Sequence, residues 1–262
     1  MKFTVDGREV FATTGGTDFE PAKPTVVFLH GAGFDRTVWR LQTRWFAHHG
    51  RSVLALDFPA HGWSAGPALT SIVAMADWTA QFIAAAGLEN AALVGHSMGA
   101  LVALDCAARH PDKVREMALC GVAVDMPVHP EMLASAKANT LKVQELMTFW
   151  GLGNALHKGG MVSPGLWLRR ESLAVLSGNQ PDVIHTDLAA CNAYKDAPAR
   201  AVSVKCPTVL ILGDGDLMTP APKATPLAAA IAGSKTVVIP NCGHFMMVER
   251  PDETLEALKT NV

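Results

Sequence analysis

The sequence predicts an α/β fold with a mostly parallel, doubly wound sheet and one long helical insertion. Short apolar and β-branched runs alternate with runs of helical periodicity, and this order is typical of a parallel sheet with helices on both faces. Residues 126–198 break the alternation, because they contain helical patterns, such as 131–150, and no strand-like run. A connection of this length exceeds the usual loop between two strands. We therefore expect residues 1–125 and 199–262 to form the core, and residues 126–198 to form a helical cap over the carboxyl edge of the sheet.

The elements of the core can be placed from their boundaries. The chain begins with a hairpin over residues 3–11 whose turn is an Asp-Gly dipeptide. Gly50, Gly87 and Pro111 mark the ends of three helices. Apolar strands without alternation are expected where both faces of a parallel sheet are covered. The expected strands are 25–29, 52–57, 91–95, 113–122, 207–212 and 235–239, and the expected helices are 36–49, 70–86 and 98–110.

Composition limits the partners of the chain. The 262 residues carry a formal charge of -2, with 49% hydrophobic and 18% charged residues. This balance indicates one large domain with a sizeable core, and it offers no basic field for nucleic acid or an anionic membrane. The sequence has no secretory leader pattern and no apolar run of about 18 residues that would span a membrane. Five cysteines without paired spacing favour reduced thiols and a cytoplasmic location. The oligomeric state stays open.

The most informative motif is Gly95-His96-Ser97-Met98-Gly99, which lies between a strand-like run and a helical run. A serine flanked by glycines at this junction is the pattern of a nucleophile elbow, in which a tight turn exposes the serine hydroxyl above the sheet. A side chain at either glycine would collide with neighbouring backbone. The helix that follows presents free N–H groups, which favour negative charge near the serine. Ser97 is therefore the expected nucleophile.

A serine hydroxyl needs a base, and the base needs a carboxylate that orients it. His244 follows the last expected strand, and Asp216 follows the strand before it. Side chains just past strand ends meet at one edge of an open α/β sheet. We expect Asp216 to be the acid, with Asp214 and Asp125 as the alternatives.

A glycine-flanked loop, His30-Gly31-Ala32-Gly33, follows the strand at 25–29. We expect the backbone N–H of Ala32, with that of Met98, to form an oxyanion hole, in which each donor contributes on the order of 3 kcal/mol. His30, His61 and His96 are interpreted as structural residues. No Cys/His spacing of a metal site and no phosphate-binding glycine loop occurs, so we expect neither a metal nor a cofactor.

This set of motifs resembles the α/β-hydrolase superfamily, and the resemblance covers nearly the whole chain. It implies a carboxylesterase-like enzyme with a serine nucleophile and a helical cap, and it places the triad in the order Ser97, Asp216, His244. Ala60 departs from the pattern, because relatives usually have glycine before His-Gly, and we expect only a small local change there. The motifs that carry the resemblance are His30-Gly31-x-Gly33, Asp57-x-Pro59-x-His61-Gly62-x-Ser64, Gly95-His96-Ser97-Met98-Gly99, Gly213-x-x-Asp216 with Pro220, and Gly243-His244.

The expected substrate is a small or medium, mainly apolar carboxylic ester that forms an acyl-enzyme on Ser97. Apolar residues are abundant in the predicted cap, and binding pockets are mostly apolar with few polar anchors. We expect Phe34, Trp150 and Trp167 in the pocket. Other reactions remain open for the same residues: carbon–carbon bond hydrolysis of ring-cleavage dienones, enol-lactone hydrolysis and cofactor-free perhydrolysis. A small-molecule receptor on the same fold is the non-enzymatic alternative.

Overall fold

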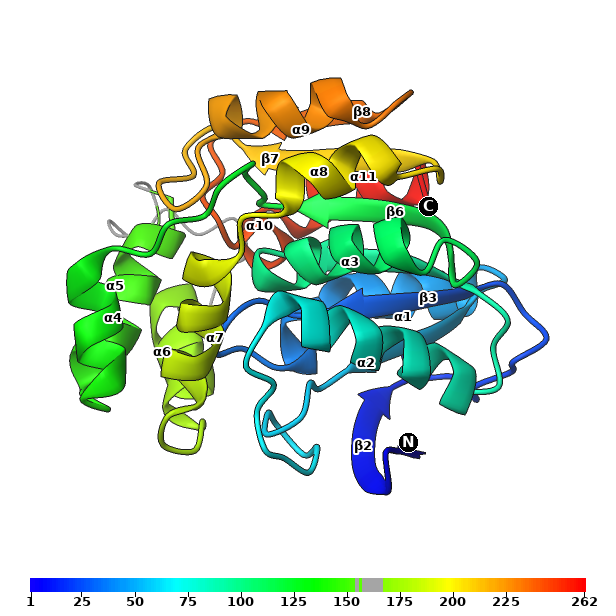
Figure 1. Ribbon diagram of the computed structural model, residues 1–262, viewed down its shortest axis with the longest axis horizontal. Coiled ribbons are helices and arrows are strands. Elements are labelled where there is room, and N and C mark those ends of the chain that lie inside the picture. Colours follow the sequence, from blue (N-terminus) through cyan, green and yellow to red (C-terminus); the bar gives the residue numbers. More distant parts are fainter. Residues whose placement is uncertain (154–155, 157–166) are drawn as a thin grey trace.

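A computed structural model describes residues 1–153, 156 and 167–262. Its centre is an eight-stranded sheet with the order β1-β2-β4-β3-β5-β6-β7-β8 (Figure 1). The first two strands form an antiparallel hairpin whose second strand also pairs antiparallel with β4, and the remaining pairs are parallel. The strands are β1 Lys2–Val5, β2 Arg8–Thr13, β3 Thr25–Leu29, β4 Ser52–Leu56, β5 Ala91–His96, β6 Val114–Cys120, β7 Thr208–Gly213 and β8 Lys235–Ile239. The expected α/β class with a mostly parallel, doubly wound sheet is confirmed.

Helices cover both faces of this sheet (Figure 1). One face carries α2 Ile72–Ala85, α3 Met98–Arg109 and α8 Ala197–Ser203, and the other carries α1 Arg40–His48 and α11 Pro251–Lys259. Shorter elements lie at the ends of strands: η1 Arg36–Trp39, η3 Ala221–Ala224, α9 Thr225–Ala230 and α10 Met246–Glu249. The expected helix at 36–49 is therefore divided into η1 and α1. Strands β3, β4 and β5 are buried along their whole length, which explains their continuous apolar sequences.

Between β6 and β7 the described part of the chain contains no strand. Four helices, here called the insertion helices, lie beyond the carboxyl ends of the parallel strands (Figure 1). They are α4 Pro130–Lys137, α5 Leu141–Gly151, α6 Leu168–Ser177 and α7 Val183–Ala193. The expectation of one helical run over 131–150 is wrong, because Asn139 adopts a φ of 51° and separates α4 from α5. No helix in the described residues is long and apolar enough to cross a membrane.

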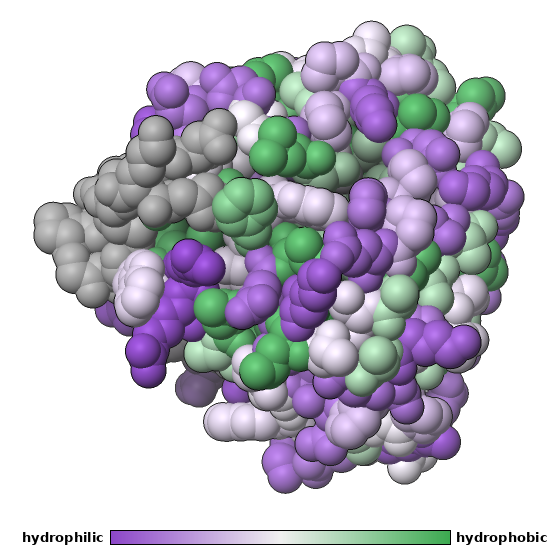
Figure 2. Space-filling model, turned by 90° about the vertical axis from the view of Figure 1, so that its left-hand side faces the viewer, coloured by the Kyte–Doolittle hydropathy of each residue, from purple (hydrophilic) through white to green (hydrophobic). Residues whose placement is uncertain are grey.

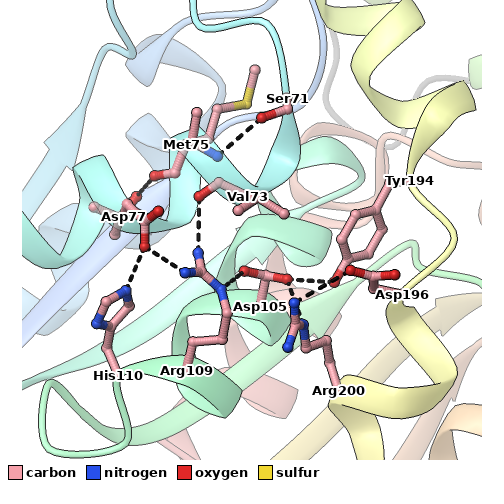
Figure 3. A network of polar contacts seen from close by, with 12 residues as sticks. Ser71, Val73, Met75, Asp77, Asp105, Arg109, His110, Tyr194, Asp196 and Arg200 are labelled. Atoms are coloured by element: carbon pink, nitrogen blue, oxygen red, sulfur yellow. Dashed lines mark hydrogen bonds and ion pairs between the residues drawn. The ribbon is translucent and has the colours of Figure 1, made fainter.

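A polar network centred on a buried aspartate attaches the end of α7 to the core (Figure 3). Asp105 lies on α3 with a fully buried side chain. One of its oxygens, Oδ2, accepts the hydroxyl of Tyr194 at 2.8 Å and Nε of Arg200 at 3.0 Å, while Oδ1 accepts Nε of Arg109 at 2.5 Å. Arg109 continues the network to the carbonyl of Val73 on α2 at 2.9 Å. Tyr194 directly follows α7, so this network fixes the end of that helix to α3.

Candidate active site

Ser97 stands at the sharp turn between β5 and α3. Its backbone has φ 53° and ψ -114°, a conformation that non-glycine residues rarely adopt and that stores about 1–3 kcal/mol of strain. A Cβ on Gly95 would lie 2.2 Å from the carbonyl oxygen of Gly99, and one on Gly99 would lie 2.4 Å from that of Leu29. Both positions therefore require glycine. The turn is held by the N–H of Ser97, which donates to Cys120 at 2.9 Å.

His244 and Asp216 meet at the carboxyl ends of β7 and β8. Nδ1 of His244 lies 2.7 Å from Oδ2 of Asp216, and because a carboxylate accepts, Nδ1 carries the proton. Oδ2 of Asp216 also accepts the hydroxyl of Thr219 at 2.7 Å, and Oδ1 accepts the N–H groups of Met218 and Thr219 at 2.8 Å. Burial opposes ionisation of Asp216, but the charge and hydrogen bonds of His244 and Thr219 outweigh it and lower its pKa to about 2.

The two alternative acids have other partners. Asp214 accepts the N–H of Cys242 at 3.2 Å, and Asp125 forms an ion pair with Lys195 at 2.6 Å. Of the three carboxylates, Asp216 is the one that the structure brings to His244.

The loop of residues 240–245, here called the histidine loop, is tied to α5 of the insertion. The N–H groups of His244 and Phe245 both donate to the carbonyl of Gly151, at 2.7 and 3.3 Å. The buried carboxylate of Glu249 accepts the N–H groups of Gly153, Gly243 and Phe245, each at 3.0 Å. One carboxylate thus joins the end of α5 to both sides of the histidine.

His96 connects the serine turn to the same loop. Its Nε2 donates to the backbone carbonyl of His244 at 2.9 Å, and the two rings lie 4.7 Å apart. Burial and the nearby His244 lower the pKa of His96 well below its usual range, so this ring is neutral. Its position agrees with the structural role that the sequence suggests.

The loop of residues 30–33, here called the oxyanion loop, is positioned from several sides. His30 donates from Nδ1 to the carbonyl of Gly31 at 2.9 Å and accepts the N–H of Phe58 at Nε2, 3.1 Å away. Gly33 has a φ of 67°, and its N–H donates to Asp187 at 2.8 Å. Ala32 lies between these two fixed glycines.

Ala60, the position at which this chain departs from the family pattern, has a backbone conformation that favours glycine. Ala60 adopts a φ of 70°, a left-handed conformation in which glycine is favoured over alanine. The chain keeps the turn despite the alanine, because the loop is held by other contacts. Asp57 there accepts the N–H groups of Arg36 and Trp63, each at 2.9 Å, and forms an ion pair with the Arg36 guanidinium at 2.5 Å.

A cavity of about 430 Å³ opens over Ser97 and His244. Apolar side chains of the sheet edge and the insertion form most of its wall, and polar residues enter at Asp125, His129 and Lys223. Figure 2 shows the molecule from the side that carries the insertion helices, and apolar residues gather near the middle of this view. The apolar lining residues are Ala32, Phe34, Met126, Pro127, Val128, Met132, Met147, Trp150, Leu188, Leu217, Met218, Pro220 and Phe245.

Two of the three expected pocket residues line this cavity. Phe34 and Trp150 do, and the ring of Phe34 packs edge-on against that of Phe245 at 4.9 Å. Trp167 does not: it precedes α6, and 60% of its surface is exposed. An apolar residue in a helical segment can face either the pocket or solvent, and the helical pattern alone does not decide between them.

Within the described residues, no three His, Cys, Asp or Glu side chains are placed to hold a metal ion. Ser97 and His244 line one cavity at the carboxyl edge of the sheet, and Asp216 contacts His244 there.

Comparison with known proteins identifies the family of the chain. A family described as the alpha/beta hydrolase family matches residues 26–257. The chain belongs to the alpha/beta hydrolase family. A pimeloyl-[acyl-carrier protein] methyl ester esterase of Chromobacterium violaceum is 31% identical over 252 residues, which cover 90% of this chain and 92% of the relative. An (E)-2-((N-methylformamido)methylene)succinate hydrolase of Acinetobacter baylyi is 23% identical over 240 residues, which cover 89% of this chain and 88% of the relative.

A solved enzyme structure has the same fold as this chain. The enol-lactonase from Burkholderia xenovorans LB400 superposes with a TM-score of 0.88 at 22% sequence identity, and the match covers 99% of this chain and 98% of that one. The resemblance of the sequence to the α/β-hydrolase superfamily is thus confirmed.

Proposed function

We propose that this protein, a hydrolase by family, cleaves small to medium, mainly apolar carboxylic esters through an acyl-enzyme on Ser97. The observation that carries the proposal is the 2.7 Å contact between His244 Nδ1 and Asp216, set beside a strained serine turn in one apolar cavity. Acyl transfer requires a base of fixed tautomer that can reach a hydroxyl, and His244 lines the same cavity as Ser97.

The mechanism follows from these groups. Nε2 of His244 takes the proton of the Ser97 hydroxyl while the oxygen attacks the acyl carbonyl. The backbone N–H groups of Ala32 and Met98 stabilise the resulting oxyanion, and among the described residues neither N–H donates to another acceptor. His244 then protonates the leaving alcohol, while ionised Asp216 stabilises the imidazolium. Water repeats the sequence on the acyl-enzyme and releases the acid.

The size and lining of the cavity support the substrate class. A volume of about 430 Å³ suits a small or medium molecule. Side chains from α4, α5 and α7, such as Met132, Met147 and Leu188, form part of its wall. We assign residues 126–198 the role of a cap that supplies the apolar side of the site, on a core of residues 1–125 and 199–262.

The test is hydrolysis of p-nitrophenyl esters of increasing chain length, beside a lactone, by the wild type, Ser97→Ala and the control Ser203→Ala, whose hydroxyl lies on the exposed helix α8. We expect Ser97→Ala to abolish turnover, the control to retain it, and a fluorophosphonate to add to Ser97 as seen by peptide mass spectrometry. Turnover by Ser97→Ala at near wild-type rates would refute the mechanism. Hydrolysis of the lactone but of no open-chain ester would refute the substrate class.

A further inference from the structure

We infer that Asp187, on insertion helix α7, is a positioning residue that holds the oxyanion loop in its working conformation. This inference rests on the proposed function, because it concerns the donor N–H of Ala32. Asp187 lies 154 residues from Gly33 in the sequence, yet its Oδ2 accepts the Gly33 N–H at 2.8 Å. The contact ties the residue after Ala32 directly to the insertion.

Both polar groups of Gly33 are bound by the insertion. The amide of Asn179 donates from Nδ2 to the Gly33 carbonyl at 2.6 Å, and also to the carbonyl of Leu176 at 3.0 Å. Apolar packing complements these bonds: a Cβ on Gly33 would come within 3.0 Å of side-chain atoms of both Ile184 and Leu176. The oxyanion loop thus meets α6 and α7 with no space for a side chain at residue 33.

Asp187 is held in turn by a buried partner, His61. Nε2 of His61 lies 2.8 Å from the same oxygen of Asp187, and its Nδ1 lies 3.1 Å from the carbonyl of Pro59, which can only accept. Both ring nitrogens therefore face acceptors, as in an imidazolium. Burial disfavours this charge, but the adjacent Asp187 outweighs burial and raises the pKa of His61.

The neighbouring His30 has the opposite protonation preference. Burial and the charge of His61, whose ring lies 4.8 Å away, lower the pKa of His30 to about 4. A neutral His30 can accept the Phe58 N–H and donate to Gly31, as observed. Residues 31 and 33 are thus fixed on either side of Ala32, one from the core and one from the insertion.

Stability alone does not account for this arrangement. The Asp187 side chain is fully buried, and its second oxygen, Oδ1, has no hydrogen-bond partner among the described residues. A buried ion pair with an unsatisfied oxygen is often no more stable than an apolar replacement of similar size. What the carboxylate does provide is a fixed acceptor for Gly33, next to a proposed donor of the oxyanion hole.

The experiment compares Asp187→Ala, Asp187→Asn and Asn179→Ala with a matched control, Tyr194→Phe. The control removes another buried tether between the insertion and the core, the hydroxyl that Tyr194 donates to Asp105, without touching the oxyanion loop. The readouts are kcat and KM for a p-nitrophenyl ester, and the inhibition constant of an aryl trifluoromethyl ketone, which forms a tetrahedral oxyanion on the serine.

We expect Asp187→Ala to lower kcat by about 100-fold with KM changed less than threefold, because an oxyanion donor acts in the transition state rather than on bound substrate. The inhibition constant of the ketone should rise by a similar factor. Asp187→Asn keeps an oxygen for the Gly33 N–H and should lose less. In the double variant, Asp187→Ala with Asn179→Ala, the fold-loss of kcat should be smaller than the product of the two single fold-losses, because both residues act through Gly33.

Wild-type kcat and ketone inhibition in folded Asp187→Ala would overturn the inference, as would equal losses in Tyr194→Phe. If Asp187→Ala does not fold, Asp187→Asn and Asn179→Ala test the inference by the same two readouts. Wild-type kcat and wild-type ketone inhibition in both of these variants would overturn the inference. Ser97→Ala in the same assay separates the two proposals. Full activity there would refute the serine mechanism itself, whereas an inactive Ser97→Ala beside a normal Asp187→Ala would refute only the positioning role.

Discussion

Gly151→Ala is the most direct test of the contact between the insertion and the histidine loop. A Cβ at this position would lie 2.2 Å from Cζ of Phe245, whereas ordinary contact begins at 3.4 Å. The ring or the end of α5 must therefore move by about 1.2 Å, the difference between these two distances. Phe245 is buried and follows His244, and the Gly151 carbonyl accepts the N–H groups of both residues.

The displacement has two expected consequences. Overpacking should lower the free energy of unfolding by about 1–3 kcal/mol. A shift of about 1 Å in a catalytic group can lower the rate about 100-fold, so we expect kcat for a p-nitrophenyl ester to fall by that order. Rates should be normalised to the fraction of molecules that a fluorophosphonate titrates, and stability should be measured by urea unfolding.

Gly178→Ala is the matched control. Gly178 directly follows α6 and has a φ of -75°. A Cβ added to Gly178 would have the Val175 carbonyl oxygen as its nearest neighbour, at 3.3 Å. For Gly178→Ala we expect the wild-type kcat and a free energy of unfolding within about 1 kcal/mol of the wild-type value. If Gly151→Ala behaves like Gly178→Ala in both measurements, the histidine loop does not depend on α5 and the reasoning is wrong.

Further predictions concern the acid, the pocket and the strained loop. Asp216→Asn should lower kcat on the order of 10⁴-fold, because the amide no longer fixes the tautomer of His244; a loss below tenfold in ester hydrolysis would contradict this. The pKa of Asp216 falls from 3.8 to about 2 on folding. The ionised carboxylate therefore contributes about 2 kcal/mol to the free energy of unfolding above pH 4, and this contribution is lost as the pH falls toward 2. Urea unfolding of Asp216→Asn should not show this loss. Trp150→Ala should shift KM across the ester chain-length series, whereas Trp167→Ala should not. Ala60→Gly should raise the unfolding free energy by up to about 1 kcal/mol, and a decrease would argue against strain at this residue.

The order of the core elements could be predicted from the sequence because local patterns decide it. Strands β3, β4 and β5 are buried on both faces and therefore read as apolar runs. The serine turn was equally visible, since Gly95 and Gly99 have no room for a side chain. Asp216 and His244 could be paired because both follow strand ends at the same sheet edge.

The insertion was harder to predict because distant contacts decide its shape. Asn139 breaks the expected helix at 131–150, and its side chain exchanges two hydrogen bonds with Asp182, at 2.9 and 2.8 Å, across 43 positions of sequence. Asp187 and Glu249 were missed for the same reason, since their partners at Gly33 and Gly153 lie far away in the chain. The one available signal for Asp187 was a lone carboxylate within the apolar sequence of α7.

Among the described residues, hydrogen bonds attach α7 to the core through Asp187 in its middle and through Tyr194 directly after its end. A chimera that exchanges the whole of residues 126–198 with a relative would exchange both attachments as well. Grafting only the segment that ends before α7, at Asp182, would alter six of the thirteen apolar wall residues named above while Asp187 and Tyr194 stay native. Such a graft would keep the Asp187 and Tyr194 contacts, but it would also have to retain Gly151 and Asn179, whose backbone and side chain support the histidine loop and the oxyanion loop.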